Sequence, residues 1–299
     1  MEIKMSEEKQ DLSWLLSGLP EMKEESLDES QKHFKKEIEV IDFISAVLGG
    51  LAFFTMANQR NENVLLSSTY PSSDWKFHAH LTDLINTLLS IKELCLNGFD
   101  TQARSLVRVL DERIYQNLIL FSSPEDYKAW AEAESSKQAH YELFSKKKAI
   151  FKKIRALEEK YLDQKNTQEA LTIRKENEEY YSDSIHGASI SIYAGSLAYP
   201  FGNLDDDPFV STLYGRASSC SFQTLHHSIG QMAYFVIMID AILEDVHSLK
   251  NIEASDLIDT YRNNRYQIME KAINLILADE HQDEPNKSKH SDSVNAADV

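Results

Sequence analysis

One segment limits the folds open to this chain more than any other. The helix expected from about Ala217 to Leu249 is apolar at its centre, where residues 232–239 read Met-Ala-Tyr-Phe-Val-Ile-Met-Ile. A helix that is apolar on every side has to be surrounded by other elements. We therefore expect this segment to be the central helix of the protein, with the remaining elements packed around it.

The rest of the sequence also favours helices. Nine glycines and six prolines among 299 residues are few for a protein rich in turns. Apolar residues recur at three- and four-residue spacing in segments 74–97 and 100–121, as on one face of a helix. The sequence predicts an all-α protein, a single bundle of about six to eight helices spanning residues 26–279. Residues 1–25 are expected to be loosely attached and flexible, and residues 280–299 to form a disordered polar tail.

Local signals predict several helix boundaries. Gly98 is suited to end a helix, because glycine takes positive φ without a steric cost. Asp100 is a good N-cap for the next helix. Ser123 followed by Pro124 is typical of another helix start, with the serine as cap and the proline in the first turn. Upstream, one long helix is predicted over residues 27–59.

Charge and cysteine content exclude several classes of protein. The net charge of −17 argues against broad affinity for nucleic acids. Cys95 and Cys220 are the only cysteines, too few for a disulfide framework or a zinc pattern, so a reducing cytoplasm is expected. The first residues lack the apolar core of a signal peptide. The apolar run 43–57 is shorter than the roughly twenty residues that span a bilayer, which predicts a buried helix and no membrane contact.

The segment 100–121 supplies the first half of a candidate site. Arg104, Arg108, Asp111 and Glu112 lie among apolar residues of this predicted helix. One interpretation is intrahelical ion pairing, worth a few tenths of a kcal/mol for each pair, about 0.2–0.5. The other is that a second layer of helices covers these side chains and forms a polar pocket. Arginine suits phosphate in such a pocket, because its planar donors bind bidentately and it stays charged.

The second half of the candidate site centres on His186, which lies among small and polar residues. On a helix, Ser182 and Asp183 would precede it by one turn and could orient its ring. Tyr181 and Ser184 would share a neighbouring face. A histidine placed in this way can act as a general acid or base near neutral pH. The alternative is a histidine that is satisfied by backbone partners at the end of a helix.

Asp240 is a lone acid in the apolar central segment. Once buried it needs a partner, and Arg104 or Arg108 is the candidate. Nearby, Glu244 and His247 form a Glu-x-x-His sequence, half of the di-iron motif of helical bundles. The chain holds no second copy of this motif, so no metal site is predicted, and no cofactor-binding motif occurs.

The segment Lys146–Arg155 contains six basic residues in ten. It is either a solvated helix face balanced by Glu142, Glu158 and Glu159, or a contact to an RNA backbone. The sequence alone leaves both interpretations open.

The two halves of the candidate site resemble a widespread, mostly prokaryotic family of helical domains of unknown function, DUF5677. The resemblance covers roughly residues 75–250 and implies no established activity. The first family pattern, Gly…Ala-x-x-Leu-x-Arg-x-x-x-Glu, matches Gly98, Ala103, Leu106, Arg108 and Glu112. The second, Tyr-x-x-x-Ser-x-x-His-Gly, is similar to the stretch with Tyr180 or Tyr181, Ser184, His186 and Gly187, in which one residue rather than two separates the serine from the histidine.

A weaker likeness is to the HEPN helical domains, many of which are metal-independent ribonucleases of toxin and antiviral systems. Their signature is an arginine four to six residues before a histidine on one helix, whereas Arg174 lies twelve residues before His186. The arginine would have to be Arg104 or Arg108. Two functions therefore stay open. We expect a non-catalytic helical interaction or sensor module, for example in a prokaryotic defence or toxin system, with a protein partner or a second copy. The alternative is a HEPN-like ribonuclease that uses His186.

Overall fold

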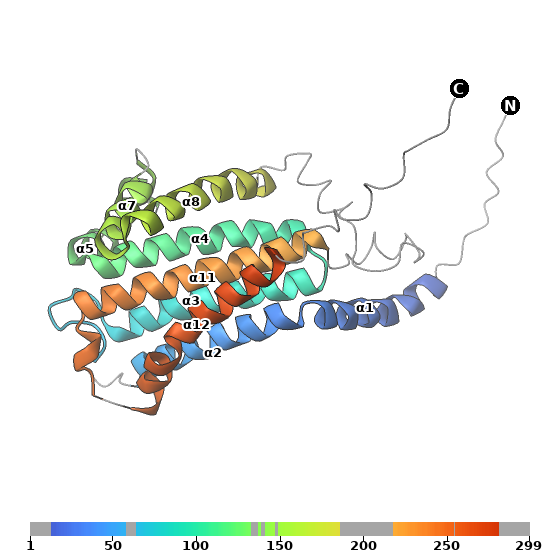
Figure 1. Cartoon of the computed structure of the whole chain (residues 1–299), viewed down its shortest axis with the longest axis horizontal. Coiled ribbons are helices and arrows are strands. Elements are labelled where there is room, and N and C mark those ends of the chain that lie inside the picture. Colours follow the sequence, from blue (N-terminus) through green and yellow to red (C-terminus); the bar gives the residue numbers. More distant parts are fainter. Residues whose placement is uncertain are drawn as a thin grey trace, which may run out of the picture.

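The computed structural model describes residues 13–57, 64–132, 137–138, 141–146, 149–185, 218–253 and 255–280, and the regular elements in them are helices. The predicted all-α bundle is confirmed (Figure 1). Its α-helices are α1 (Ser13–His33), α2 (Lys35–Ala57), α3 (Asp74–Leu96), α4 (Asp100–Ser122), α5 (Pro124–Ala131), α7 (Ala149–Tyr161), α8 (Gln164–Ile185), α11 (Ser219–Asp245) and α12 (Asp256–Glu280). A π-helical turn, η1 (Tyr141–Ser145), and a 3₁₀ turn, η3 (Leu249–Asn251), complete the described elements.

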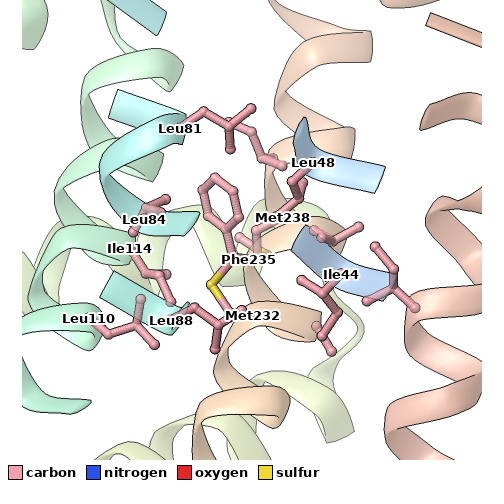
Figure 2. Packing of buried hydrophobic residues seen from close by; sticks show 14 of the residues in the cluster. Ile44, Leu48, Leu81, Leu84, Leu88, Leu110, Ile114, Met232, Phe235 and Met238 are labelled. Carbon is pink, nitrogen blue, oxygen red and sulfur yellow. The ribbon is translucent and has the colours of Figure 1, made fainter. Parts of the chain in front are cut away.

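Helix α11 is the centre of the bundle, as its apolar sequence predicts. It packs against α2, α3, α4 and α12. Figure 2 shows Phe235 of α11 among side chains of α2, α3 and α4. Fully burying one such side chain contributes about 1.5–3 kcal/mol. The labelled neighbours are Ile44, Leu48, Leu81, Leu84, Leu88, Leu110, Ile114, Met232 and Met238.

Further helix contacts complete the bundle. Helices α7 and α8 cover α4, and α12 lies along α2 (Figure 1). The predicted single helix over 27–59 is in fact two helices, and the first begins at Ser13. They join at Phe34, where the Phe34 amide donates to the Ser30 carbonyl and the Ile38 amide donates to the Phe34 carbonyl, both at 2.9 Å. The helical hydrogen bonding therefore runs through the junction. Residues 1–12 and 281–299, which include most of the predicted flexible ends, lie outside the described residues.

The predicted helix boundaries around α3, α4 and α5 are confirmed in two of three cases. Gly98 has φ 71° and ends α3, with the Phe99 amide donating to the Leu94 carbonyl at 2.8 Å. Ser123 caps α5 and accepts a hydrogen bond from the Asp126 amide at 3.1 Å. The assignment of Asp100 as an N-cap is wrong. Phe99 occupies that position, and the Asp100 side chain is used elsewhere.

Asp74 fixes the loop that leads into α3. Its buried carboxylate accepts three backbone N–H groups from consecutive residues, at 2.8–2.9 Å. A carboxylate satisfied in this way orders a loop that has little regular structure of its own. The donors are Val64, Leu65 and Leu66.

His247 ties the same loop to α4. Its Nδ1 accepts from the Ser67 amide at 3.1 Å, and its Nε2 donates to the Phe121 carbonyl at 2.9 Å. This pair of bonds requires the neutral ring, with the proton on Nε2. Glu244 of the same Glu-x-x-His sequence accepts from the Lys250 amide at 3.0 Å. Both side chains therefore serve the local structure.

The stability of the fold should fall as the pH drops below about 6.5, the usual value for histidine. Burial lowers the pKa of His247, and it also lowers that of His80. A histidine with a lowered folded-state pKa contributes fully above the unfolded value and loses its contribution as the unfolded chain takes up protons. Urea unfolding at pH 7.5 and 5.5 measures this loss, which should shrink in His247→Gln. His33→Gln, at an exposed position, is the control, and an unchanged pH dependence in His247→Gln would contradict the assignment.

Helix α2 is long and apolar enough to cross a membrane by length and composition over Lys35–Met56. Half of its apolar window is buried inside the bundle. Core helices of soluble proteins commonly meet the same criteria, so the finding is weak evidence for a membrane span. The absence of membrane contact stays a prediction.

Candidate functional site

The first turn of α4 is joined to the first turn of α11 through Asp100. This side chain is 2% exposed, and its carboxylate accepts the hydroxyls of Ser218, at 2.5 Å, and Ser221. Ser218 also caps α11, accepting from its backbone amides. Two helix N-termini thus share one carboxylate, a favourable arrangement for a negative charge. Burial raises the pKa of Asp100, opposed by the two hydroxyls and by Arg104.

Arg104 lies one turn farther along α4 and is only 2% exposed. Its neighbours include Asp100 and the buried thiols of Cys95 and Cys220. Burial raises the pKa of both thiols, against the effect of the arginine. Arg104 is therefore part of the interior of the bundle, as the pocket interpretation requires, but its charge lies beside a buried carboxylate.

Arg108 does not share this position. It lies on the outer side of α4, with its side chain 30% exposed, and its Nε is 3.3 Å from Oε1 of Glu112. This is the intrahelical ion pair that the spacing allows. An exposed pair of this kind contributes little to stability, because water and salt screen it. The two arginines therefore differ in burial, Arg104 inside the bundle and Arg108 at the surface of α4.

Asp111 belongs to the contact between α4 and α11. Its Oδ2 lies 3.3 Å from Nε2 of His227, and burial raises the pKa of the carboxyl group. The expected ion pair of Asp111 with an arginine of its own helix is therefore replaced by a contact across the helix interface. Asp111 and His227 are both mostly buried, with exposed side-chain fractions of 14% and 11%.

Asp240 does not pair with Arg104 or Arg108, so that prediction is wrong. Its Oδ1 lies 3.1 Å from Nε of Arg265, and the Tyr261 hydroxyl donates to the same oxygen. Both partners are on α12, because the side of α11 that carries Asp240 packs on α12 rather than on α4. The acid was correctly expected to need a partner, and the partner comes from a helix outside the candidate site.

A second buried polar cluster, which the sequence reasoning missed, joins α4, α7, α8 and α11. Glu158 is fully buried and accepts hydrogen bonds from Arg174 and, at 2.8 Å, from the Tyr234 hydroxyl. The guanidinium of Arg174 lies 5.3 Å from the centroid of the Tyr115 ring. Burial by itself lowers the pKa of Arg174, but Tyr115 and Glu158 outweigh it and the net shift is upward. This cluster anchors α8 to the bundle.

The sequence held a signal for this cluster. One interpretation of the basic segment places Glu158 on a solvated face, whereas the structure shows that it is fully buried. It follows Ile154 by four residues and precedes Tyr161 by three, so it lies within the apolar stripe of α7. A carboxylate within an apolar stripe predicts a buried cation nearby.

The second half of the candidate site is described only in its backbone. Tyr181 and Ser184 lie on α8, which ends at Ile185, while their side chains and the whole of His186 lie outside the described residues. Helix α8 runs antiparallel to α4, since Arg174 lies over Tyr115 and both helices continue in opposite directions from there (Figure 1). Its last turn therefore lies at the same end of the bundle as the first turns of α4, which carry Arg104.

The resemblance of the sequence to a protein family is confirmed. The model of the Family of unknown function (DUF5677) matches residues 74–230. The chain belongs to this family. The matched region runs from α3 to the middle of α11 and contains both halves of the candidate site. Helices α1, α2 and α12 lie outside it. No curated protein and no solved structure shows a significant match.

The DUF5677 region also contains the basic segment. Three of its cations have carboxylate partners: Lys146 with Glu142 at 2.8 Å, Lys153 with Asp126 at 2.5 Å and Arg155 with Glu159 at 2.8 Å. Among the described residues, no group of three or more histidine, cysteine, aspartate or glutamate side chains could hold a metal ion. RNA binding by the basic segment stays a prediction.

Proposed function

We propose that this member of DUF5677 is a non-catalytic helical interaction module. The supporting observation is the position of the two candidate arginines. Arg104 lies inside the bundle beside Asp100, whose carboxylate joins α4 to α11. Arg108 pairs with Glu112 on the outside. A phosphate-binding arginine needs donors directed at its ligand. Arg104 is instead buried within electrostatic range of the Asp100 carboxylate, and Arg108 is paired with Glu112.

One observation favours the ribonuclease alternative. The antiparallel packing of α8 on α4 brings the last described residue before His186 to the end of the bundle that carries Arg104. An arginine and a histidine from different helices could therefore contribute to one site. This alternative requires Arg104 to act on a phosphate in spite of its burial.

A cleavage assay decides between the two functions. Purified protein is incubated with labelled single-stranded RNA in the presence of EDTA, and growth is compared on expression in bacteria. We expect intact RNA and equal growth for the wild type, His186→Ala and Arg104→Lys, because the module has no catalytic site. His33→Ala is the control for a histidine away from the site. Metal-independent cleavage by the wild type that is lost in His186→Ala but kept in His33→Ala would establish the ribonuclease instead.

A further inference from the structure

Four large apolar side chains at one end of the bundle are exposed to solvent, with exposed fractions of 38–58%. They are Phe53 and Met56 of α2, Val64 of the loop that follows it and Trp75 of α3. We call these four residues the α2–α3 patch. Exposed apolar side chains that are scattered singly are ordinary, whereas a contiguous group marks an interaction surface.

Helices α2 and α3 pack side by side in opposite directions. Nδ1 of His78, near the start of α3, lies 2.8 Å from the carbonyl oxygen of Ala52, near the end of α2. Farther along α3, the Lys92 ammonium lies 2.7 Å from Oδ1 of Asp42. A later residue of α3 therefore contacts an earlier residue of α2, so the two helices are antiparallel. The last turns of α2 and the first turns of α3 share one end of the bundle.

All four side chains of the patch belong to this shared end. One turn from the contact between His78 and α2, toward the loop, α2 carries Met56 and α3 carries Trp75, so these two residues are level with each other. Phe53 precedes Met56 by three residues on the same face of α2. The Val64 amide donates to Oδ2 of Asp74 at 2.8 Å, which holds Val64 next to Trp75. The four exposed side chains are therefore neighbours and form one apolar surface.

The first turn of α12 gives this surface an acidic border. A Cβ added at Gly50 would lie 3.6 Å from the Leu257 carbonyl oxygen, so α12 begins beside the end of α2 (Figure 1). Phe53 follows Gly50 by three residues and is on the same side of α2. Glu253 and Asp256, which immediately precede this contact in the chain, are exposed. The apolar surface therefore lies next to carboxylates.

We propose that the α2–α3 patch binds a basic amphipathic helix of a partner protein. The proposal rests on the interaction function proposed above and names the class of partner. Trp75 and Phe53 are the anchors, because large aromatic side chains contribute most of the affinity at such interfaces. Lysine and arginine side chains on the polar face of the partner helix lie near Glu253 and Asp256.

The size of the patch favours a single helix over a folded partner. A specific interface between two folded proteins buries about 800 Å² on each side, more than four partly exposed side chains supply. An amphipathic helix that lays its apolar face on a small surface needs only a few anchors, spaced by three, four or seven residues. In the part of the chain that the structure describes, the regular elements are helices, so an extended peptide finds no sheet edge to extend.

Charge favours a basic partner over a second copy of the chain. The chain carries a net charge of −17, so a second copy would bring the same charge and the same acidic border. A cation also adjoins the patch, since the Lys76 ammonium lies 5.9 Å from the centroid of the Trp75 ring and 5.8 Å from that of Tyr127. Two aromatic faces attract this ammonium group within the chain itself. The charge of the whole molecule then steers a basic helix toward the surface.

Fluorescence anisotropy of a labelled peptide tests the proposal with the full chain. The probe is a helix of about eighteen leucine and lysine residues, with leucines at positions i, i+3, i+4 and i+7. We expect a Kd of about 10 µM, and at least about tenfold weaker binding to Phe53→Glu and to Trp75→Glu. Each substitution adds a negative charge that by itself would favour a basic peptide, so weaker binding reports the lost apolar contact.

Ile173→Glu is the matched control, because Ile173 is 50% exposed on α8 and receives the same charge. It should bind the peptide like the wild type. A peptide of the same composition without the helical spacing of leucines should bind at least about tenfold more weakly, and so should a helix of leucine and glutamate. Circular dichroism confirms that each variant is folded.

Several results would overturn the proposal. They are no binding at about 100 µM protein, equal binding by Phe53→Glu and the wild type, and equal binding of the peptide without helical spacing. Sedimentation that shows a dimer lost in Phe53→Glu would assign the surface to a second copy. Binding to phosphatidylcholine and phosphatidylglycerol vesicles that is lost in Phe53→Glu would assign it to a membrane. Ribonuclease activity would overturn the non-catalytic function and leave the peptide result unchanged.

Discussion

Replacing Glu158 with alanine is expected to lower the free energy of unfolding by about 3–5 kcal/mol. The substitution removes the carboxylate that compensates the buried guanidinium of Arg174 and leaves the Tyr234 hydroxyl without its acceptor. An uncompensated charge in the interior costs far more than the ion pair contributes. Urea unfolding followed by circular dichroism measures the loss. Glu159→Ala is the matched control, because this neighbouring glutamate is exposed and pairs with Arg155 at the surface, where removal should cost less than about 0.5 kcal/mol.

A double variant separates the cost of an unpaired charge from the contribution of the pair. In Glu158→Leu with Arg174→Met, apolar side chains of similar size replace both charges, so most of the stability should return. Hydrogen exchange should report faster exchange along α8 in Glu158→Ala, since Arg174 anchors this helix to the bundle. Equal losses in Glu158→Ala and Glu159→Ala would show that the cluster does not hold α8.

The architecture of the bundle follows from short-range information in the sequence. The position of α11 at the centre is predictable, because an all-round apolar helix can be stable only there. The end of α3 is predictable too, since Gly98 takes a positive φ that other residues avoid. Such features depend on residues close together in the chain. For the same reason, the capping of α5 by Ser123 could be read directly from the sequence.

The partners of the charged side chains were harder to predict. The acid Asp240 was correctly identified as needing a partner, but Arg265 was not foreseen, because the choice depends on which helix packs beside α11. The carboxylate of Asp100 was assigned to the local helix start, whereas it bonds to residues more than a hundred positions away. Helical periodicity gives the buried face of a helix but not the helix that covers it. The contact between Arg104 and His186 stays a prediction, because His186 lies outside the described residues.

The second large effect is expected at Asp100, where Asp100→Ala should cost about 2–4 kcal/mol. The substitution removes the acceptor of two buried hydroxyls and the carboxylate beside the buried Arg104. Asp100→Asn should cost less, because one amide oxygen can still accept from Ser218 or Ser221. Gln102→Ala, at an exposed position two residues along α4, is the control and should be close to neutral.

The same variants show whether the contact between α4 and α11 at Asp100 belongs to the candidate site or only to the fold. If this contact serves only the fold, Asp100→Ala lowers the free energy of unfolding in urea. It also gives faster hydrogen exchange at the first turns of both α4 and α11. Ser218→Ala should reproduce part of it, since Ser218 both bonds to Asp100 and caps α11. A fully stable Asp100→Ala protein would show that the hydrogen bonds of Asp100 do not hold α4 and α11 together. It would also remove the main support for a structural role of Arg104, and the pocket formed by Arg104 and the end of α8 would become the stronger interpretation.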